Sequence, residues 1–266
     1  MPIYIDQMMR KVEVTSAPLR IVSLVPSQTE LLYDLGLKEE VAGITKFCIH
    51  PNEWFKSKTR VGGTKQVNHQ KIDALKPNLI IGNKEENSKE DIEILMQKYP
   101  VWMSDINTFE DALKMIECIA NIAQTSEKGK KIVEKINHEF ELLTQVSSSK
   151  KRIAYFIWNE PMMVAGADTF INNMLTKLGF ENVFAKSLTS NQFSYRYPQI
   201  TNNELEAAAP EIIYLSSEPF PFKEKHIQQF KAICPRAKII IVDGEMFSWY
   251  GSRMLLAPCY FKTLLL

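Results

Sequence analysis

Cys48 and His50 are the residues of this 266-residue chain whose types and spacing could most directly do chemistry. A thiolate and an imidazole two positions apart suit a soft metal ion such as zinc or copper. The same pair could serve as nucleophile and base, with Lys84 or Glu85 assisting. Cys48 could instead pack as a small hydrophobe. No third metal ligand is identified, so the metal interpretation is the weaker of these hypotheses.

A larger set of polar and aromatic residues could hold a ligand without reacting with it. The loop 84–87 concentrates charge, and the residues near 196 and 250 could form an opposite wall through stacking and charge. The alternatives are a solvated turn at 84–86 and simple helix packing at 249–250. The candidate ligand-binding residues are Cys48, His50, Thr64, Lys65, Lys84, Glu85, Glu86, Asn87, Trp158, Arg196, Tyr197, Trp249, Tyr250 and Arg253.

Strands that alternate with helices must position these residues in the first half of the chain. Short apolar runs at 20–25, 41–45, 79–82 and 101–103 are each followed by a loop and a helical pattern. Such alternation predicts an α/β fold with a parallel sheet and crossover helices. Ligands of such sheets bind beyond the carboxyl ends of the strands, where the candidate loops fall.

Local signals place the ends of individual helices. Ser27 and Glu30 predict a capping box at the start of the first helix, and Gly36 predicts its end. Later helices are expected to start near Ser88 and at Asp168 or Thr169, and the second of these to end at Gly179.

The segment 126–146 predicts one long amphipathic helix, because its apolar residues recur every three or four positions. About 20 residues would make a rod of about 30 Å. The alternation of strands and helices then begins again. We therefore expect an N-terminal α/β lobe at 1–124, a connecting backbone helix at 125–148 and a C-terminal α/β lobe at 149–266.

Composition restricts the partners. The formal net charge of +1 gives no support for a nucleic-acid partner, and no run of residues is apolar enough to predict membrane insertion. The first residues lack the pattern of a signal peptide, so we expect a cytoplasmic protein. It would be periplasmic or lipid-anchored if Met1 is not the native start. The four cysteines are scattered, which predicts reduced thiols.

Four segments resemble one family. They are RIVSLVPSQTE at 20–30, KIDALKPNLII at 71–81, GFENVF at 179–184 and GSR at 251–253. Together they resemble the class III substrate-binding proteins of ABC transporters, the cobalamin and iron-siderophore type. The resemblance implies two Rossmann-like lobes joined by a single backbone helix. It also implies reversible binding of a small ligand, such as cobalamin or another metal complex, in a cleft between the lobes.

The sequence departs from that family at two kinds of position. Where cobalamin-binding relatives have aromatic residues, this chain has Thr64, Asn83 and Met163, while Tyr197 keeps a ring. The resemblance therefore implies a more polar cleft, for which a smaller polar or metal-bearing ligand is as plausible as a corrin.

The second departure concerns the permease. In the resembling receptors, one surface glutamate on each lobe docks onto the permease, and the matching positions here are Gln70 and Asn203. Nearby Asp73 and Glu204 could substitute for them. We therefore expect docking to an ABC permease to be doubtful.

Three hypotheses of function remain. A solute-binding protein is favoured because the common nucleotide-binding and hydrolase motifs are absent from the sequence. The alternatives are a cytoplasmic enzyme that uses Cys48, His50, Lys84 and Glu85, and a metal sensor or chaperone that uses the first two.

Overall fold

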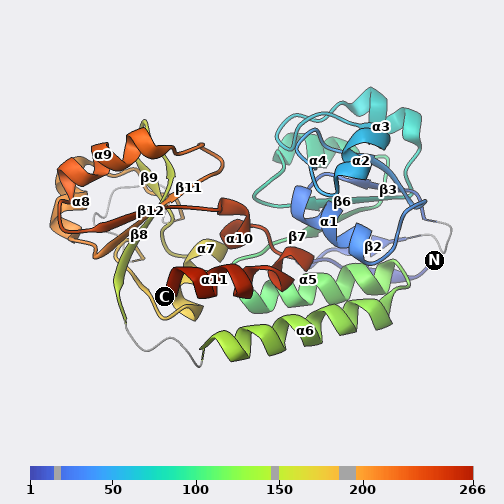
Figure 1. The fold of residues 1–266 in the computed structure, drawn as a ribbon. Helices are drawn as coiled ribbons and strands as arrows, with labels where there is room; N and C mark the ends of the chain where they lie inside the picture. Colours follow the sequence, from blue (N-terminus) through green and yellow to red (C-terminus); the bar gives the residue numbers. More distant parts are fainter. Residues whose placement is uncertain (15–18, 145–149, 186–195, 266) are drawn as a thin grey trace. The chain divides into compact units, whose positions relative to one another are not determined.

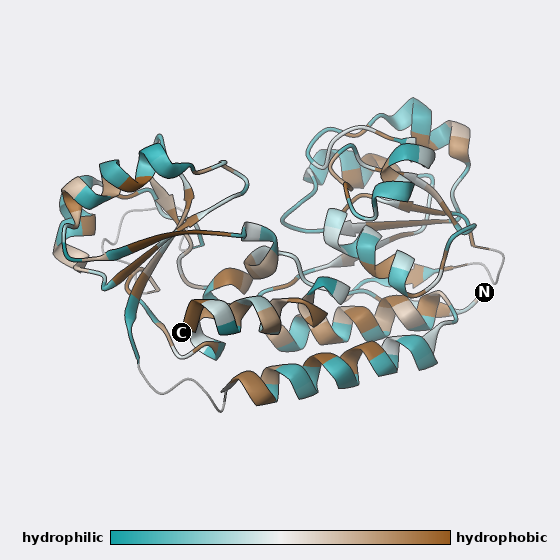
Figure 2. Ribbon diagram, viewed as in Figure 1, coloured by the Kyte–Doolittle hydropathy of each residue, from teal (hydrophilic) through white to brown (hydrophobic). Residues whose placement is uncertain are grey.

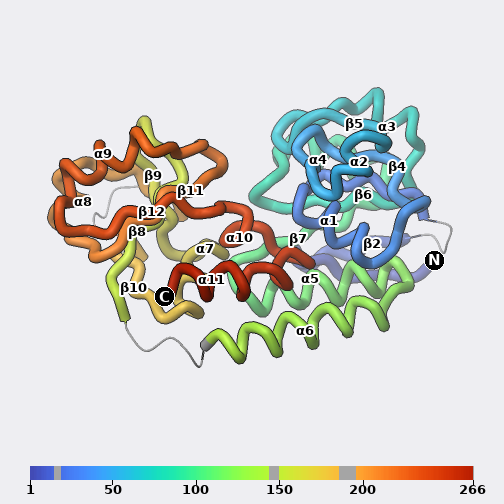
Figure 3. The backbone as a smooth tube through the Cα atoms, viewed as in Figure 1, coloured from blue at the N-terminus to red at the C-terminus, as the bar shows by residue number. Residues whose placement is uncertain are grey.

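The protein is described here by a computed structural model, which covers residues 1–14, 19–144, 150–185 and 196–265. Its internal contacts divide the chain into two compact units. Unit 1 comprises Met1–Ile106, Glu110–Ile136 and Tyr250–Leu255, and unit 2 comprises Asn107–Phe109, Asn137–Trp249 and Leu256–Leu266. Figure 3 traces the backbone through both units. The α/β class with two parallel sheets is confirmed.

Unit 1 is built on a five-stranded sheet in the order β5-β4-β3-β6-β7, and all neighbouring strands are parallel. Every residue of β3, β6 and β7 is buried, which explains their continuous apolar sequence. The bounds of the strands are Ile21–Ser23 for β3, Val41–Ile44 for β4, Thr59–Arg60 for β5, Leu79–Asn83 for β6 and Val101–Ser104 for β7.

Helices connect these strands, and a small antiparallel hairpin precedes them (Figure 1). The bounds are Ile3–Ile5 for β1, Lys11–Glu13 for β2, Pro26–Asp34 for α1, Asn52–Ser57 for α2, His69–Leu75 for α3, Lys89–Met96 for α4 and Phe109–Ile122 for α5.

The start of α1 differs from the prediction. The helix begins at Pro26, its N-cap is Val25, and no side chain caps it. Ser27 therefore lies inside the helix, and Glu30 binds Arg253 instead of closing a capping box. Proline at the first position supplies a helical φ without needing its N–H, which explains the earlier start. The predicted end is confirmed, since Gly36 adopts a φ of 86°.

Helix α6 spans Ser126–Thr144, so the predicted long helix is confirmed as far as the structure describes it; positions 145 and 146 lie outside the described residues. Apolar and polar residues alternate along it in Figure 2. Gly129 allows close packing on α5, because a Cβ there would collide with the Cβ of Ala120. The small residues thus set how closely the two helices approach.

Unit 2 contains a second sheet in the order β10-β8-β11-β12, all parallel, with β9 antiparallel to β8. Its strands are Arg152–Trp158 for β8, Met163–Val164 for β9, Glu181–Asn182 for β10, Ile212–Ser216 for β11 and Lys238–Val242 for β12. Its helices are Phe170–Lys177 for α7, Asn202–Ala208 for α8, Glu224–Ile233 for α9, Gly244–Ser248 for α10 and Ala257–Leu265 for α11.

Two separate helices close the chain. A short 3₁₀ helix, Ser252–Leu255, belongs to unit 1, and α11 begins at Ala257 in unit 2. Pro258 explains the break, because its ring cannot follow a preceding helical turn without a clash and it donates no hydrogen bond. The proline is tolerated only in the first turn of a new helix.

Candidate ligand-binding site

The carboxyl ends of the unit 1 strands bring together loops that are far apart in sequence. They are residues 45–50 after β4, 61–66 after β5, 84–87 after β6 and Asp105 after β7. The turn after β5 requires Gly62, which has a φ of 111° and where a Cβ would lie 2.7 Å from the carbonyl oxygen of Gln66. This turn places Thr64 and Lys65 among the site loops.

Two buried asparagines fix the charged loop at 84–87. The side-chain oxygen of Asn83 accepts hydrogen bonds from the backbone N–H groups of Glu85 (2.8 Å) and Glu86 (3.0 Å). Asn87 accepts from the N–H of Asn83 at 2.8 Å. Its amide donates to the carbonyl oxygens of Leu24 at 3.2 Å and of Thr64 at 3.0 Å. Asn87 thus joins three loops, which explains its burial.

The charged side chains of this loop remain accessible. Lys84 is exposed and binds the Asp105 carboxylate at 2.6 Å. Lys65 is exposed too, and its ammonium donates to the carbonyl oxygen of Glu85. Glu85 and Glu86 are half-buried. The sequence prediction of a charged surface at this edge agrees with these positions, although Asn87 itself is inside and acts on the backbone.

Cys48 lies where neither metal binding nor nucleophilic attack is accessible to it. The side chain is fully buried, and its sulfur is 3.1 Å from the hydroxyl oxygens of both Thr29 and Thr45. Burial raises the pKa of the thiol, and the two hydroxyls offset only part of that effect. His50 is half-buried in the same loop. Among the described residues, no group of three or more His, Cys, Asp or Glu is placed to hold a metal ion.

An exposed aromatic residue stands in that loop instead. Phe47 is 50% exposed, and the ammonium of Lys46 lies 5.0 Å from the centre of its ring. Ile49 is 44% exposed. The sequence analysis did not single out Phe47; its signal was an aromatic residue in the loop that follows the β4 strand.

A pair of rings lies at the carboxyl ends of β8 and β11 in unit 2. Trp158 is 39% exposed, and its ring centre is 5.6 Å from that of Phe220 at an interplanar angle of 61°. The backbone N–H of Phe220 donates to the carbonyl of Ile157 at 3.3 Å, which holds the loop against β8. Phe222 and His226 pack beneath Phe220, with ring centres 4.8 Å and 5.4 Å away. The sequence analysis singled out Trp158 but not Phe220.

Glu218, in the same loop, is a largely buried carboxylate that the sequence analysis also missed. It accepts hydrogen bonds from the Ser248 hydroxyl at 2.7 Å and from the indole N–H of Trp249 at 3.0 Å. Burial raises its pKa, the charges of Glu245 and Asp243 raise it further, and these two hydrogen bonds offset part of the shift. Trp249 is therefore buried and engaged inside unit 2.

Arg196 and Tyr197 are both half-buried in unit 2. The guanidinium of Arg196 donates to the side-chain oxygen of Asn107. The backbone carbonyl of Arg196 accepts from the N–H of Gly166 at 2.7 Å. The residues that precede Arg196, 186–195, lie outside the described residues. The structure thus fixes Arg196 on its own unit.

Tyr250 and Arg253 are buried in unit 1. Burial raises the pKa of the Tyr250 hydroxyl, and the charges of Glu86 and Glu85 raise it further. Arg253 makes a two-point ion pair with Glu30, at 2.8 and 2.6 Å, and is only 7% exposed. A charge held in this way joins the 3₁₀ helix to α1 and contributes to the fold. Both residues serve packing here.

Each unit thus presents loops at the carboxyl ends of a parallel sheet, where ligands of such sheets bind. A family model described as "Periplasmic binding protein" matches residues 21–233, so the chain belongs to that family. The chain is therefore a solute-binding protein that reversibly binds a small ligand.

The chain is also similar in sequence and structure to known solute-binding proteins. The chain is 27% identical over 245 residues to the vitamin B12-binding protein of Photorhabdus laumondii, covering 91% of this chain and 86% of the relative. It is 28% identical over 195 residues to the uncharacterized ABC transporter substrate-binding lipoprotein YvrC of Bacillus subtilis, covering 69% and 62%. The structure of the periplasmic vitamin B12 binding protein BtuF of Vibrio cholerae superposes with a TM-score of 0.78 at 21% identity, covering 93% and 97%.

The expected cytoplasmic location is wrong. The relatives are periplasmic proteins or lipoproteins, which conflicts with it. The prediction relied only on the first residues of the sequence. In the described residues, no helix is both long and apolar enough to cross a bilayer.

Proposed function

We propose that the protein is the receptor of an ABC importer and that its ligand is a corrinoid. The Trp158–Phe220 ring pair carries this proposal, because it offers an exposed aromatic face where the unit 2 strands end. Phe47 offers a second such face at the unit 1 strand ends. A rigid, flat macrocycle gains most from contacts of this kind, since both partners lose little conformational freedom.

Charged groups at the unit 1 strand ends would orient the ligand. A corrin carries carboxamide groups around its edge, which can accept hydrogen bonds from Lys65 and Lys84 and donate them to Glu85 or Glu86. These four residues, together with Thr64, Arg196 and Tyr197, are the polar contacts that we propose. The proposal contains no catalytic step, and the burial of Cys48 leaves the enzyme hypothesis without an accessible nucleophile.

A receptor of an ABC importer must also dock onto its permease, and two surface positions are candidates for that contact. Gln70 and Asn203 are exposed in the first turns of α3 and α8. The neighbouring carboxylates make hydrogen bonds within their own unit: Asp73 accepts from the Tyr99 hydroxyl at 2.6 Å, and Glu204 accepts from the N–H of Thr201 at 2.7 Å. We propose that the permease docks here without the pair of carboxylates seen in the resembling receptors. A Gln70→Glu, Asn203→Glu double variant should then not increase stimulation of the cognate importer in proteoliposomes.

Titration of cyanocobalamin by calorimetry, with hemin as the comparison ligand, tests the corrinoid proposal. Trp158→Ala and Phe220→Ala should each weaken the affinity at least tenfold, which corresponds to about 1.4 kcal/mol. Phe55→Ala, which removes a half-buried ring from α2, is the matched control and should have no effect. The proposal fails if cyanocobalamin does not bind, or if both ring variants bind it as tightly as the original chain.

A further inference from the structure

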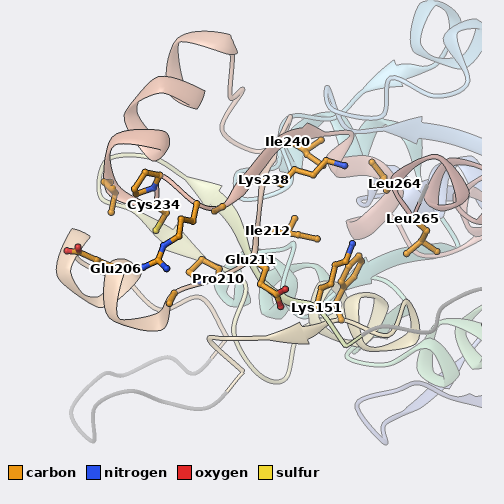
Figure 4. Close-up of a pocket in the computed structure, with 16 residues that line it drawn as sticks. Lys151, Glu206, Pro210, Glu211, Ile212, Cys234, Lys238, Ile240, Leu264 and Leu265 are labelled. Atoms are coloured by element: carbon orange, nitrogen blue, oxygen red, sulfur yellow. The ribbon is translucent and has the colours of Figure 1, made fainter.

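A hollow of about 690 Å³ lies at the amino ends of the unit 2 strands. Lys151 precedes β8, Glu211 precedes β11 and Lys238 begins β12, and all three line it (Figure 4). The amino ends of parallel strands lie at the edge of the sheet opposite their carboxyl ends. The hollow is therefore separate from the Trp158–Phe220 surface, and its size is typical of small-molecule sites.

One part of the hollow is apolar. Among its lining residues Phe180 and Ile212 are buried, whereas Ile240, Leu264 and Leu265 are only half-buried. Aliphatic side chains at the end of α11 thus leave apolar surface accessible inside a concave site. Covering such surface with an aliphatic chain would remove it from water, at a gain of roughly 25 cal/mol per Å².

The charge of the hollow favours an anion. Lys151, Arg236 and Lys238 are exposed, and none of them makes a side-chain ion pair within the part of the chain that the structure describes. The lining also holds Glu206 and Glu211, so three cations against two carboxylates give +1. The Glu211 carboxylate already accepts the backbone N–H of Arg152 at 2.9 Å, which satisfies part of its hydrogen-bonding capacity.

The two lysines and the leucines face one another. In Figure 4 the side chains of Lys151 and Lys238 both extend toward Leu264 and Leu265. A lysine ammonium binds an anion as a compact point charge with three rotatable donors, and a carboxylate can accept from two such groups, one at each oxygen. Two ammonium groups beside an aliphatic wall match a carboxylate that carries a hydrocarbon chain.

We propose that this hollow is a second binding site, which takes an amphipathic carboxylate with an unbranched chain of about ten carbons. Lys151 and Lys238 bind the head group, and the chain lies on Ile240, Leu264 and Leu265. The inference does not rest on the corrinoid proposal, because the two sites occupy opposite edges of the unit 2 sheet.

Calorimetric titration with decanoate at pH 7 tests the proposal on the whole chain. Decanoate should bind, hexanoate should bind at least tenfold more weakly because four methylenes are missing, and decyltrimethylammonium should not bind. Lys151→Ala and Lys238→Ala should each weaken decanoate binding at least fivefold, and Leu264→Asp at least tenfold. Lys225→Ala, which removes an exposed lysine of α9 outside the hollow, is the matched control and should leave the affinity unchanged.

A second measurement uses the unsubstituted protein, so it does not depend on the folding of any variant. Decanoate should protect the amines of Lys151 and Lys238 from reductive methylation, read by mass spectrometry, and leave Lys225 reactive. Saturating cyanocobalamin should not displace decanoate from the hollow. Lack of decanoate binding, equal binding of decyltrimethylammonium, or no protection of the two lysines would each overturn the proposal. Failure of corrinoid binding alone would leave it standing.

Discussion

The two units arrange their strand-end loops by different chemistry. In unit 1, Asn83 and Asn87 hold the loops through hydrogen bonds to backbone groups. In unit 2, the packed rings of Phe220, Phe222 and His226 support the corresponding loop beside the hydrogen bonds that Glu218 accepts. Both loops follow parallel strands, so the same topology allows either solution.

The difference has a physical consequence. Hydrogen bonds are directional, and removing one partner leaves buried polar groups unsatisfied, so shape alone cannot replace an asparagine. Ring packing depends on filled volume, so another apolar side chain can replace part of it. The four predictions below use this contrast.

The largest effect is expected at Phe222. Its ring is 4% exposed and lies 4.8 Å from Phe220 and 5.9 Å from Phe230, centre to centre. Phe222→Ala should lower the free energy of unfolding by about 4 kcal/mol, and Phe222→Leu by about 1.5 kcal/mol, because leucine refills most of the volume. Urea unfolding measures both, and equal losses in the two variants would contradict packing as the cause.

Asn87 should show the opposite pattern. Asn87→Ala and Asn87→Leu should each cost about 3 kcal/mol, because both leave the N–H of Asn83 and the carbonyls of Leu24 and Thr64 without the amide. Urea unfolding again provides the measurement. Asn121→Ala, on the exposed face of α5, is the control and should change little. A leucine variant that recovers most of the stability would remove the contrast between the units.

The pH dependence of stability at Asp91 tests the contribution of hydrogen bonds in unit 1. Burial alone would raise its pKa, but hydrogen bonds from His69, the N–H of Val67 and Ser88 outweigh burial and lower it. A lowered folded pKa gives stability that is complete above the ordinary aspartate pKa, about 3.9, and is lost as pH falls through the folded value. Asp91→Asn should therefore cost about 1 kcal/mol at pH 7 and less at pH 3. A constant difference in unfolding free energy across that range would contradict this assignment.

Glu218 should give a smaller effect of opposite sign. Burial and the charges of Glu245 and Asp243 raise its folded pKa. Its stabilising contribution is then complete below the ordinary glutamate pKa, about 4.3, and is lost as pH rises through the folded value. Relative to Glu218→Gln, the original chain should lose up to about 1 kcal/mol between pH 4.5 and pH 7. Thermal unfolding at several pH values measures it, and a gain with rising pH would refute the raised pKa.

Local pattern determined the order of elements and the family. The strands at 79–83 and 212–216 follow from continuous apolar runs, and the helix ends at Gly36 and Gly179 follow from the positive φ that glycine accepts. The α6 helix follows from apolar spacing alone. These features depend on residues near one another in the chain, so the sequence was enough to predict them.

Tertiary structure decided which of the candidate residues are accessible. Cys48 is buried because Thr29 of α1 and Thr45 after β4 close around it. Arg253 is engaged because Glu30 lies beside it although it is 223 positions away in the chain. The Trp158–Phe220 pair forms because β8 and β11 are neighbours in the sheet. Spacing within a segment contains no information on which distant segments will pair, so burial, ion pairing and ring contacts of this kind required the folded chain.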